Sequence, residues 1–398
     1  MASRVIAVIA IVVLVTATIF AAKVVTQILS PGNVHTGGEQ NGRSRYEAIP
    51  SSAVKVTPQS DLFPPILHSN EWEPPVPIPG PINTAGAEDS PFIMPDDHWF
   101  FFFFTPDLNL PAEKQIADGV TGIYWSQRAG NTWTDPQRII LASYNSLDGC
   151  EFVQGDVMWF CSVRAGNYRA ADVYTAQYVN GIWTNVTNAG KQLNADYSIG
   201  EFCLNPDGNT LYFGSNRAGG FGGKDIWYTT KSESGWTAPI NLGPVVNGRQ
   251  DEDQPFITPN GQELWFTGTS RLGYAGPAIF RSIKLPDGSW GQPQEIISRF
   301  AGEPTLDDQG NIYFVHHYLT KDMKLIEADI YVAYHKPGPS QGVGSEISWQ
   351  QMTVWDSLRS VDAWPPSTFL RTMELSMIRE LKLPNFWERS GFHAACPY

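Results

Sequence analysis

Residues 201–243 read EFCLNPDGNTLYFGSNRAGGFGGKDIWYTTKSESGWTAPINLG, and this stretch decides the fold. It contains four short runs rich in β-branched and aromatic residues, a composition that favours strands. Turn residues separate the runs. In Asn205-Pro206-Asp207-Gly208 the proline presets φ, the aspartate bonds its own backbone and the glycine accepts a positive φ. The stretch therefore predicts a four-stranded antiparallel meander of about 45 residues.

The same pattern recurs along the chain. The outer run of each copy carries a tryptophan that we interpret as a packing residue: Trp72, Trp133, Trp183, Trp236 and Trp290. One meander cannot bury both of its faces alone, so successive copies must stack around an axis. We therefore predict an all-β fold, a five-bladed β-propeller of four-stranded antiparallel blades over residues 70–336. A β-sandwich is the alternative, but a sandwich does not require repeated copies of one four-run pattern.

The repeats resemble those of TolB-like, WD-type propellers. The resemblance rests on Asn205-Pro-Asp-Gly, Ser215-Asn-Arg and Asp225-Ile-Trp-Tyr, with Thr258-Pro-Asn-Gly and Ser162-Val-Arg in neighbouring copies. It covers about residues 70–336 and implies the propeller fold. It implies little about function, because propellers of this type serve as binding platforms, scaffolds and enzymes.

Composition and charge narrow the classes of function. The 398-residue chain is 42% hydrophobic and 17% charged, which predicts a folded protein rather than long disorder. Its formal net charge of −13 argues against nucleic acid and against anionic membrane surfaces as partners. The same charge is compatible with cations or basic partners.

The two ends of the chain read differently from the repeats. Residues 1–29 hold an apolar run between Arg4 and Lys23, which predicts a signal anchor or, alternatively, a cleaved signal peptide. The repeats would then lie outside the cytoplasm, either tethered to the membrane by this helix alone or secreted. Residues 30–69 read as a tether. Residues 337–398 read as a C-terminal extension with an amphipathic helix that either packs on the propeller or binds a partner.

Carboxylates recur at or just before the first run of each repeat: Asp89, Glu151, Glu201, Asp253 and Glu303. First strands line the channel of a propeller, so these side chains should converge at one mouth. Like charges that meet raise one another's pKa, and such clusters bind cations or perform acid–base chemistry. We predict a site for a polar ligand or a cation, a divalent cation included, and no other cofactor. Alternatively, each carboxylate caps a turn or pairs locally.

Three arginines end the second runs of neighbouring repeats, near the same mouth: Arg164, Arg217 and Arg271. Arg164 and Arg217 each precede an aspartate, Asp172 or Asp225, across a loop. An Arg–Asp pair that braces the loop is one interpretation, and recognition of a sugar or carboxylate is the other. The neighbours His316 and His317 should point to opposite faces of a strand, with His317 on a solvent-exposed rim.

Two pairings can be predicted from the pattern. Residues 71–79 match the outer run at Trp236, so we expect them to close the ring beside residues 329–334, with residues 346–352 as the competing segment. Gly155-Asp156 reads as a two-residue hairpin loop. Counting outward from it pairs Cys150 with Cys161, which predicts a disulfide in an exported chain. A bulge in the hairpin would break this register and leave two free thiols.

Two functions follow as hypotheses. The first is a binding or scaffold module for a protein or an envelope polysaccharide. The second is a glycoside hydrolase, because Asp89-Ser-Pro-Phe before Trp99-Phe-Phe looks similar to the start of five-bladed propeller glycosidases of the arabinanase and xylosidase type. That resemblance implies Asp89, Glu151 and Glu201 as catalytic carboxylates, although Ser90 separates the aspartate from its proline and the other two lack the family's context.

Overall fold

The computed structural model describes residues 43–142 and 146–337. Within these ranges, no helix is both long and apolar enough to cross a membrane. The predicted N-terminal anchor or signal peptide, the first part of the tether and nearly all of the C-terminal extension lie outside the described residues. So does the competing closing segment, residues 346–352.

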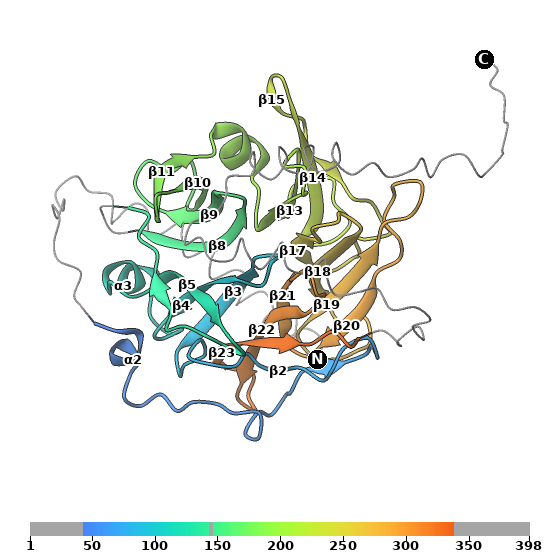
Figure 1. Cartoon of the computed structure of the whole chain (residues 1–398). Helices are drawn as coiled ribbons and strands as arrows, with labels where there is room; N and C mark the ends of the chain where they lie inside the picture. The colour runs from blue at the N-terminus through green and yellow to red at the C-terminus, as the bar shows by residue number, and fades with distance from the viewer. Residues whose placement is uncertain (1–42, 143–145, 338–398) are drawn as a thin grey trace, which may run out of the picture. The chain divides into compact units, whose positions relative to one another are not determined.

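Within the described residues, five antiparallel meanders follow one another (Figure 1). Meander 1 consists of β3 (Ala87–Ile93), β4 (Trp99–Thr105) and β5 (Gly122–Ala129), with β6 (Thr132–Trp133) and β7 (Gln137–Arg138) paired to β5. Meander 2 consists of β8 (Leu147–Gln154), β9 (Val157–Val163), β10 (Asp172–Val179) and β11 (Ile182–Asn188). Meander 3 consists of β12 (Phe202–Leu204), β13 (Thr210–Ser215) and β14 (Asp225–Ser232), with β15 (Gly235–Trp236) and β16 (Ile240–Asn241) paired to β14.

The last two meanders each receive a strand from the beginning of the chain. Meander 4 consists of β17 (Glu252–Ile257), β18 (Glu263–Thr269), β19 (Pro277–Ile283) and β20 (Gln294–Ser298), with β1 (Ile66–Leu67) on its outer edge. Meander 5 consists of β21 (Ala301–Leu306), β22 (Ile312–Leu319) and β23 (Leu325–Ala333), with β2 (Val76–Pro77) on its outer edge. The helices are short: α2 (Arg45–Ala48), α3 (Ala112–Ala117) and the π-helix η1 (Gln192–Tyr197).

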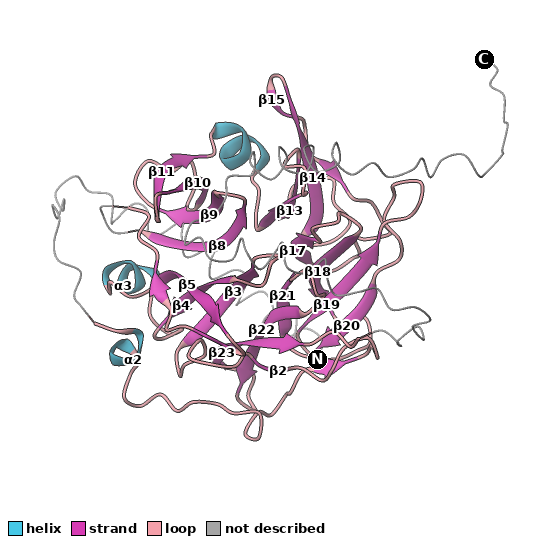
Figure 2. Ribbon diagram, in the orientation of Figure 1, coloured by secondary structure: helices cyan, strands magenta, loops and turns pink. Residues whose placement is uncertain are grey.

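The first strands of the meanders contact one another in a closed order. β3 contacts β8, β8 contacts β12, β12 contacts β17, β17 contacts β21, and β21 contacts β3. In Figure 2 the labelled first strands β3, β8, β17 and β21 lie toward the middle of this arrangement, with later strands farther out. Antiparallel meanders whose first strands surround a common centre form a β-propeller.

The predicted closure by residues 71–79 is confirmed. Val76 pairs with Val332 and Pro77 with Tyr331. The side chain of Asn83 accepts from the amide of Ile330 at 3.0 Å and donates to its carbonyl at 2.8 Å. Asn247 makes the same two bonds to Ile226 in meander 3, so the match between the segments around Trp72 and Trp236 extends to side-chain bonding.

The repeated tryptophans join neighbouring meanders. Four of them contact an aromatic side chain on the second strand of the preceding meander: Trp183 contacts Phe101, Trp236 contacts Trp159, Trp290 contacts Tyr212 and Trp72 contacts Trp265. The ring centroids are 5.6 to 6.5 Å apart and the rings are edge-on, a favourable aromatic geometry. Trp133 lies against Phe100 within its own meander. These contacts support the interpretation of the tryptophans as packing residues.

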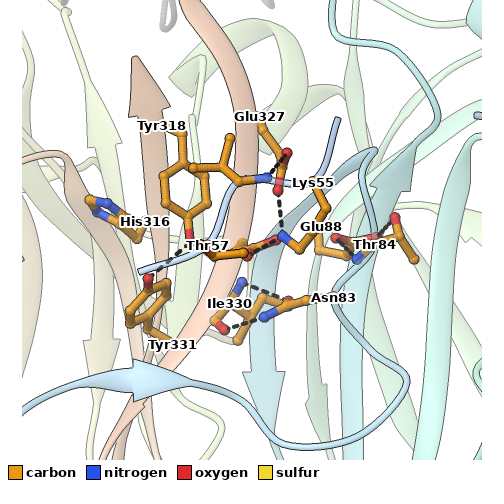
Figure 3. Close-up of polar contacts among 12 residues, drawn as sticks. Lys55, Thr57, Asn83, Thr84, Glu88, His316, Tyr318, Glu327, Ile330 and Tyr331 are labelled. Carbon is orange, nitrogen blue, oxygen red and sulfur yellow. Dashed lines mark hydrogen bonds and ion pairs between the residues drawn. The ribbon is translucent and has the colours of Figure 1, made fainter. Parts of the chain in front are cut away.

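Residues 43–69, which we call the strap, were predicted as part of a free tether, and for these residues that prediction is wrong. Buried Arg45 pairs with Glu88 of β3. Lys55 bonds to Glu327 of β23 (Figure 3), and it also bonds to Asp329 of the same strand. β1 adds to β20. The strap therefore belongs to the folded unit. Its polar, proline-rich composition conceals this, because its anchoring depends on partners far away in the sequence.

Candidate functional site

Four of the five first strands carry a β-bulge at the same place. The ladder shifts register between Asp89 and Phe92, Gly149 and Phe152, Asp253 and Phe256, and Gly302 and Thr305. Each bulge contains one non-glycine residue with positive φ: Ser90, Cys150, Gln254 and Glu303. A bulge adds a residue to one strand and redirects the neighbouring side chains. In four of the five meanders, a bulge thus redirects side chains near the centre.

The amide of Gln254 joins two of the predicted carboxylates. Its nitrogen lies 3.2 Å from Oε1 of Glu201 and 2.7 Å from Oε1 of Glu303. These two oxygens are therefore less than about 6 Å apart, although they come from meanders 3 and 5. With Asp89 and Asp253, they form a group that we call the acidic cluster.

Lys224 supplies the positive charge of this cluster. Its ammonium group bonds to Oδ2 of Asp253, and it ends the glycine-rich loop that follows β13. The loop is fixed to the segment before β17, because the Lys224 amide donates to Asp251 at 2.7 Å and the Lys224 carbonyl accepts from the amide of Glu252 at 2.8 Å. A loop of meander 3 thus places its lysine over the first strand of meander 4.

A glycine makes room for Asp253. A Cβ atom on Gly214 of β13 would lie 1.7 Å from Oδ1 of Asp253, far inside van der Waals contact. The carboxylate therefore lies against bare backbone of the neighbouring meander. Close approach of this kind requires glycine.

Burial and mutual repulsion raise the pKa of carboxyl groups in and beside the cluster. Burial, followed by the charge of Asp253, raises the pKa of Glu201 to about 8. Burial and the charges of Asp89 and Glu201 raise the pKa of Glu303 well above its ordinary value. Burial, with a contribution from Asp89, also raises the pKa of Glu151. Like charges in a poorly hydrated place disfavour full ionisation.

Several carboxyl oxygens in this region are buried without a hydrogen-bond partner. They are Oδ1 of Asp89, Oδ1 of Asp253 and both carboxyl oxygens of Glu151. Buried polar atoms are normally paired, so unpaired acceptors require an explanation such as a bound ligand. No group of three or more His, Cys, Asp or Glu residues in the described ranges is placed to hold a metal ion. The unpaired oxygens are acceptors, so the donors of a cation or a polar group suit them.

The three predicted arginines are engaged elsewhere, and the predicted Arg–Asp loop braces are wrong. Arg164 pairs with Asp148 instead of Asp172, at 2.6 Å. Arg271 pairs with Glu252 at 3.3 Å and donates to the carbonyl of Val246. Arg217 donates to the carbonyl of Tyr197 and lies over the Trp227 ring, not against Asp225. Arg164 and Arg271 tie first strands to the segments before them, whereas Arg217 reaches back to Tyr197. A role of these arginines in ligand binding stays a prediction.

The predicted cysteine register is also wrong. The bulge in β8 pairs Gly149, not Cys150, with Cys161, and both cysteines are free thiols in the structure. A hydrogen bond to Cys161 and burial raise the pKa of Cys150. The two-residue hairpin loop itself is present, since Gln154 pairs with Val157. The prediction failed because the bulge adds one residue to β8, and counting residues outward from the turn does not reveal such an insertion.

The two histidines occupy different surroundings, as alternation along a strand requires. His316 is fully buried, and its Nε2 lies 3.0 Å from Oδ2 of Asp61 in the strap. His317 is partly exposed, and burial lowers its pKa while Asp89 opposes that shift.

Sequence reasoning did not find Gln254, Lys224 or Gly214. One signal was available for the first of these. Ser90-Pro91, Gln254-Pro255 and Glu303-Pro304 occupy the same place in three first strands, and the residue before the proline is the bulged residue with positive φ. The role of Lys224 depends on the loop path and could not be read from the repeat.

Comparison with known proteins gives likenesses of fold among solved structures. No family model and no curated protein matches the chain. Among solved structures, TolB from Acinetobacter baumannii is similar at 13% identity over 64% of this chain and 56% of its own, with a TM-score of 0.36. Xylan β-1,4-xylosidase from Bacillus halodurans C-125 is similar at 12% identity over 64% of this chain and 54% of its own, with a TM-score of 0.41.

A third similar structure is the RS223 β-xylosidase, at 11% identity over 64% of this chain and 94% of its own, with a TM-score of 0.41. Both families that the sequence resembles are thus represented. The chain spans little more than half the length of the TolB and Bacillus structures. Identities and TM-scores this low carry no argument about activity, so the function is argued from the site.

Proposed function

We propose that the chain is a five-bladed β-propeller that acts outside the cytoplasm as a binding module, tethered to the membrane or secreted. Its ligand carries a cationic group, on a protein or an envelope polysaccharide, and this group enters the acidic cluster. Support for five blades comes from the closed order of contacts among the first strands. Support for an exported location comes from the apolar run in residues 1–29.

One observation carries the choice of ligand. The acidic cluster contains four carboxylates and one lysine, and buried carboxyl oxygens of Asp89 and Asp253 remain unpaired. A ligand ammonium or guanidinium group supplies several donors and favours the ionised carboxylates. It also compensates charge that burial otherwise makes costly. The net charge of −13 attracts such a ligand over a distance.

The test uses the full chain and two cationic probes, a glucosamine hexamer and a tetralysine peptide. Their N-acetylated forms, which lack the charge, serve as ligand controls. The double variant Glu201→Gln/Glu303→Gln is expected to weaken binding of the cationic probes at least about tenfold, as loss of charge-assisted hydrogen bonds predicts. Isothermal titration calorimetry provides the measurement.

The matched protein control is Glu113→Gln/Glu233→Gln, which makes the same two substitutions at exposed positions. We expect this variant to bind like the wild type. If the wild type and Glu201→Gln/Glu303→Gln bind both probes with equal affinity, the acidic cluster is not the binding site.

Glycoside hydrolysis is a second candidate, and one observation favours it. Glu201 and Glu303 are close enough to act as the paired carboxyl groups of a retaining glycosidase, which stand about 5–5.5 Å apart. The pair differs from the set Asp89, Glu151 and Glu201 that the resemblance implies. The raised pKa of both Glu201 and Glu303 argues against a ready nucleophile at neutral pH. If the wild-type chain releases nitrophenol from aryl xylosides or arabinosides and Glu201→Gln does not, hydrolysis replaces binding as the proposed function.

A further inference from the structure

Three loops join the second and third strands of meanders 2, 3 and 4. We call them loop 2 (residues 164–171), loop 3 (residues 216–224) and loop 4 (residues 270–276). None of them adds to the ladder, yet all three are built on one plan. In each, a carboxylate of the same meander accepts two consecutive backbone amides from the loop.

The distances of these bonds are closely similar. In loop 2, Asp172 accepts from Tyr168 at 2.8 Å and from the next amide at 3.1 Å. In loop 3, Asp225 accepts from Phe221 at 2.7 Å and from the next amide at 3.1 Å. Loop 4 uses Glu295, which accepts from Arg271 at 2.7 Å and from Leu272 at 3.1 Å. The three carboxylates are buried, and hydrogen bonds to charged groups are strong, so the loops are held in place.

Each of these loops presents an apolar side chain to solvent. Tyr168 is 53% exposed, Phe221 is 49% exposed and Leu272 is 57% exposed. The amides of these residues are bonded to the carboxylates, so the backbone at each tip is fixed while the side chain is left uncovered. Because the backbone that carries them is already held, these side chains need less ordering when a partner covers them. Grouped apolar exposure is typical of interaction sites.

The loops lie at the end of the meanders that carries the acidic cluster. In an antiparallel meander, the loop between the second and third strands stands beside the start of the first strand. Loop 3 shows this directly, because it ends in Lys224, which pairs with Asp253 of the cluster. An amide of the same loop, that of Gly223, donates to the carbonyl of Gln250 just before β17.

We propose that the tips Tyr168, Phe221 and Leu272, together with the acidic cluster, form one docking surface for a protein segment in which a lysine or arginine stands between apolar residues. The inference rests on the proposed cationic ligand and extends it to the kind of molecule that carries the charge. Charge complementarity selects the basic side chain, and the loop tips select its apolar neighbours.

The chemistry of the tips favours a peptide over a polysaccharide. Leu272 is aliphatic and offers no ring face on which a sugar can stack, whereas apolar peptide side chains gain from burial against all three tips. A lysine or arginine has a long apolar stem, which suits a path from an apolar rim to a buried carboxylate.

The experiment selects random twelve-residue peptides displayed on phage against the full chain. The expected result is enrichment of peptides that combine Lys or Arg with aromatic or aliphatic residues. Affinities of enriched peptides are then measured by fluorescence anisotropy. The triple variant Tyr168→Ser/Phe221→Ser/Leu272→Ser is expected to weaken them at least tenfold, and replacing the basic residue of the peptide by acetyl-lysine is expected to do the same.

The control is Ile182→Ser/Ile283→Ser, which removes two apolar side chains that are 64% and 50% exposed at the opposite end of meanders 2 and 4. Its affinities are expected to equal those of the wild type. Melting temperatures verify that all variants fold.

Five outcomes overturn the inference. Failure to enrich basic, apolar peptides is the first, and an equal loss in the control is the second. If Glu201→Gln/Glu303→Gln weakens the peptides but the triple variant does not, the docking surface is wrong while the cationic ligand stands. If the triple variant weakens peptide binding and Glu201→Gln/Glu303→Gln does not, the proposed function is wrong as well. Equal weakening of the glucosamine hexamer by the triple variant would identify a polysaccharide surface instead.

Discussion

In both the strap contact and the acidic cluster, buried carboxylates lie around a single lysine. The two places differ in the number of hydrogen-bond donors per carboxylate. At the strap, Lys55 bonds to Glu327 and Asp329, and the amide of Val56 bonds to Glu327 as well (Figure 3). The hydroxyl of Tyr318 adds a bond to Asp329 at 3.1 Å. In the acidic cluster, the Lys224 ammonium group bonds to Asp253, Glu201 and Glu303 share one amide from Gln254, and Oδ1 of Asp89 has no partner.

The difference separates a structural ion pair from a binding site. Each strap carboxylate has a cation and a further donor, so an added ligand would have to displace protein groups. The acidic cluster has more acceptors than donors, and a ligand that brings donors completes it. Counting carboxylates alone would not distinguish the two places, and neither would one unpaired oxygen, because Oδ1 of Asp329 is unpaired as well. The number of donors per carboxylate does distinguish them.

Removing the strap lysine should have the largest effect of the three changes considered next. Lys55→Met leaves Glu327 and Asp329 buried without their cation, which should lower the free energy of unfolding by about 3 kcal/mol, as expected for half of a buried ion pair. Urea unfolding of the full chain measures this. The control is Lys191→Met, whose pair with Asp196 is exposed and should contribute less than about 1 kcal/mol. Equal losses in the two variants would mean that the strap pair is not structural.

Overpacking the cluster should have an intermediate effect. Gly214→Ala places a Cβ atom 1.7 Å from Oδ1 of Asp253, so the carboxylate or the strand must move, at a cost of about 1–3 kcal/mol. The affinity for cationic probes should fall with it, because Asp253 leaves its place. Gly302→Ala is the matched control, since its Cβ would meet Thr267 at 3.3 Å and need only a small adjustment. A Gly214→Ala protein with unchanged stability and affinity would contradict the close approach.

Within any one pH unit, the smallest of these effects is a change in pH dependence. The pKa of Glu201 is about 8 in the folded protein, whereas an unfolded glutamate titrates near 4.3, so the folded state holds the extra proton between these values. Stability should therefore fall as pH rises through this window, and one such group contributes at most about 1.4 kcal/mol per pH unit. Glu201→Gln should flatten the slope between pH 5 and 8 in urea titrations. Exposed Glu113→Gln should leave it unchanged, and equal slopes in both variants would refute the buried proton.

The sequence allowed the repeat and its closure to be predicted, because these depend on patterns within about 50 residues and on one recurring match. Trp72 and Asn83 could be aligned with Trp236 and Asn247 without any knowledge of the fold. The recurrence of acidic residues on first strands was visible for the same reason.

The contacts between repeats could not be predicted. The bulge at Cys150 changes register by one residue, and sequence periodicity gives no measure of that shift. Gln254 bridges two carboxylates from meanders on either side of its own, and Lys55 finds its partners more than 270 residues away. Such partners are set by the order in which the meanders surround the centre.

The closing strand also constrains how the protein is made. Asn83 and Ile330, which bond to one another, are 247 residues apart in the chain. A ribosome releases the early residues first, so the segment around β2 must wait until meander 5 has emerged. Until then β23 presents an open strand edge, to which another chain can add. Contacts of such long range slow folding, and the last step of ring assembly is therefore the one at which misassembly between chains competes with the native structure.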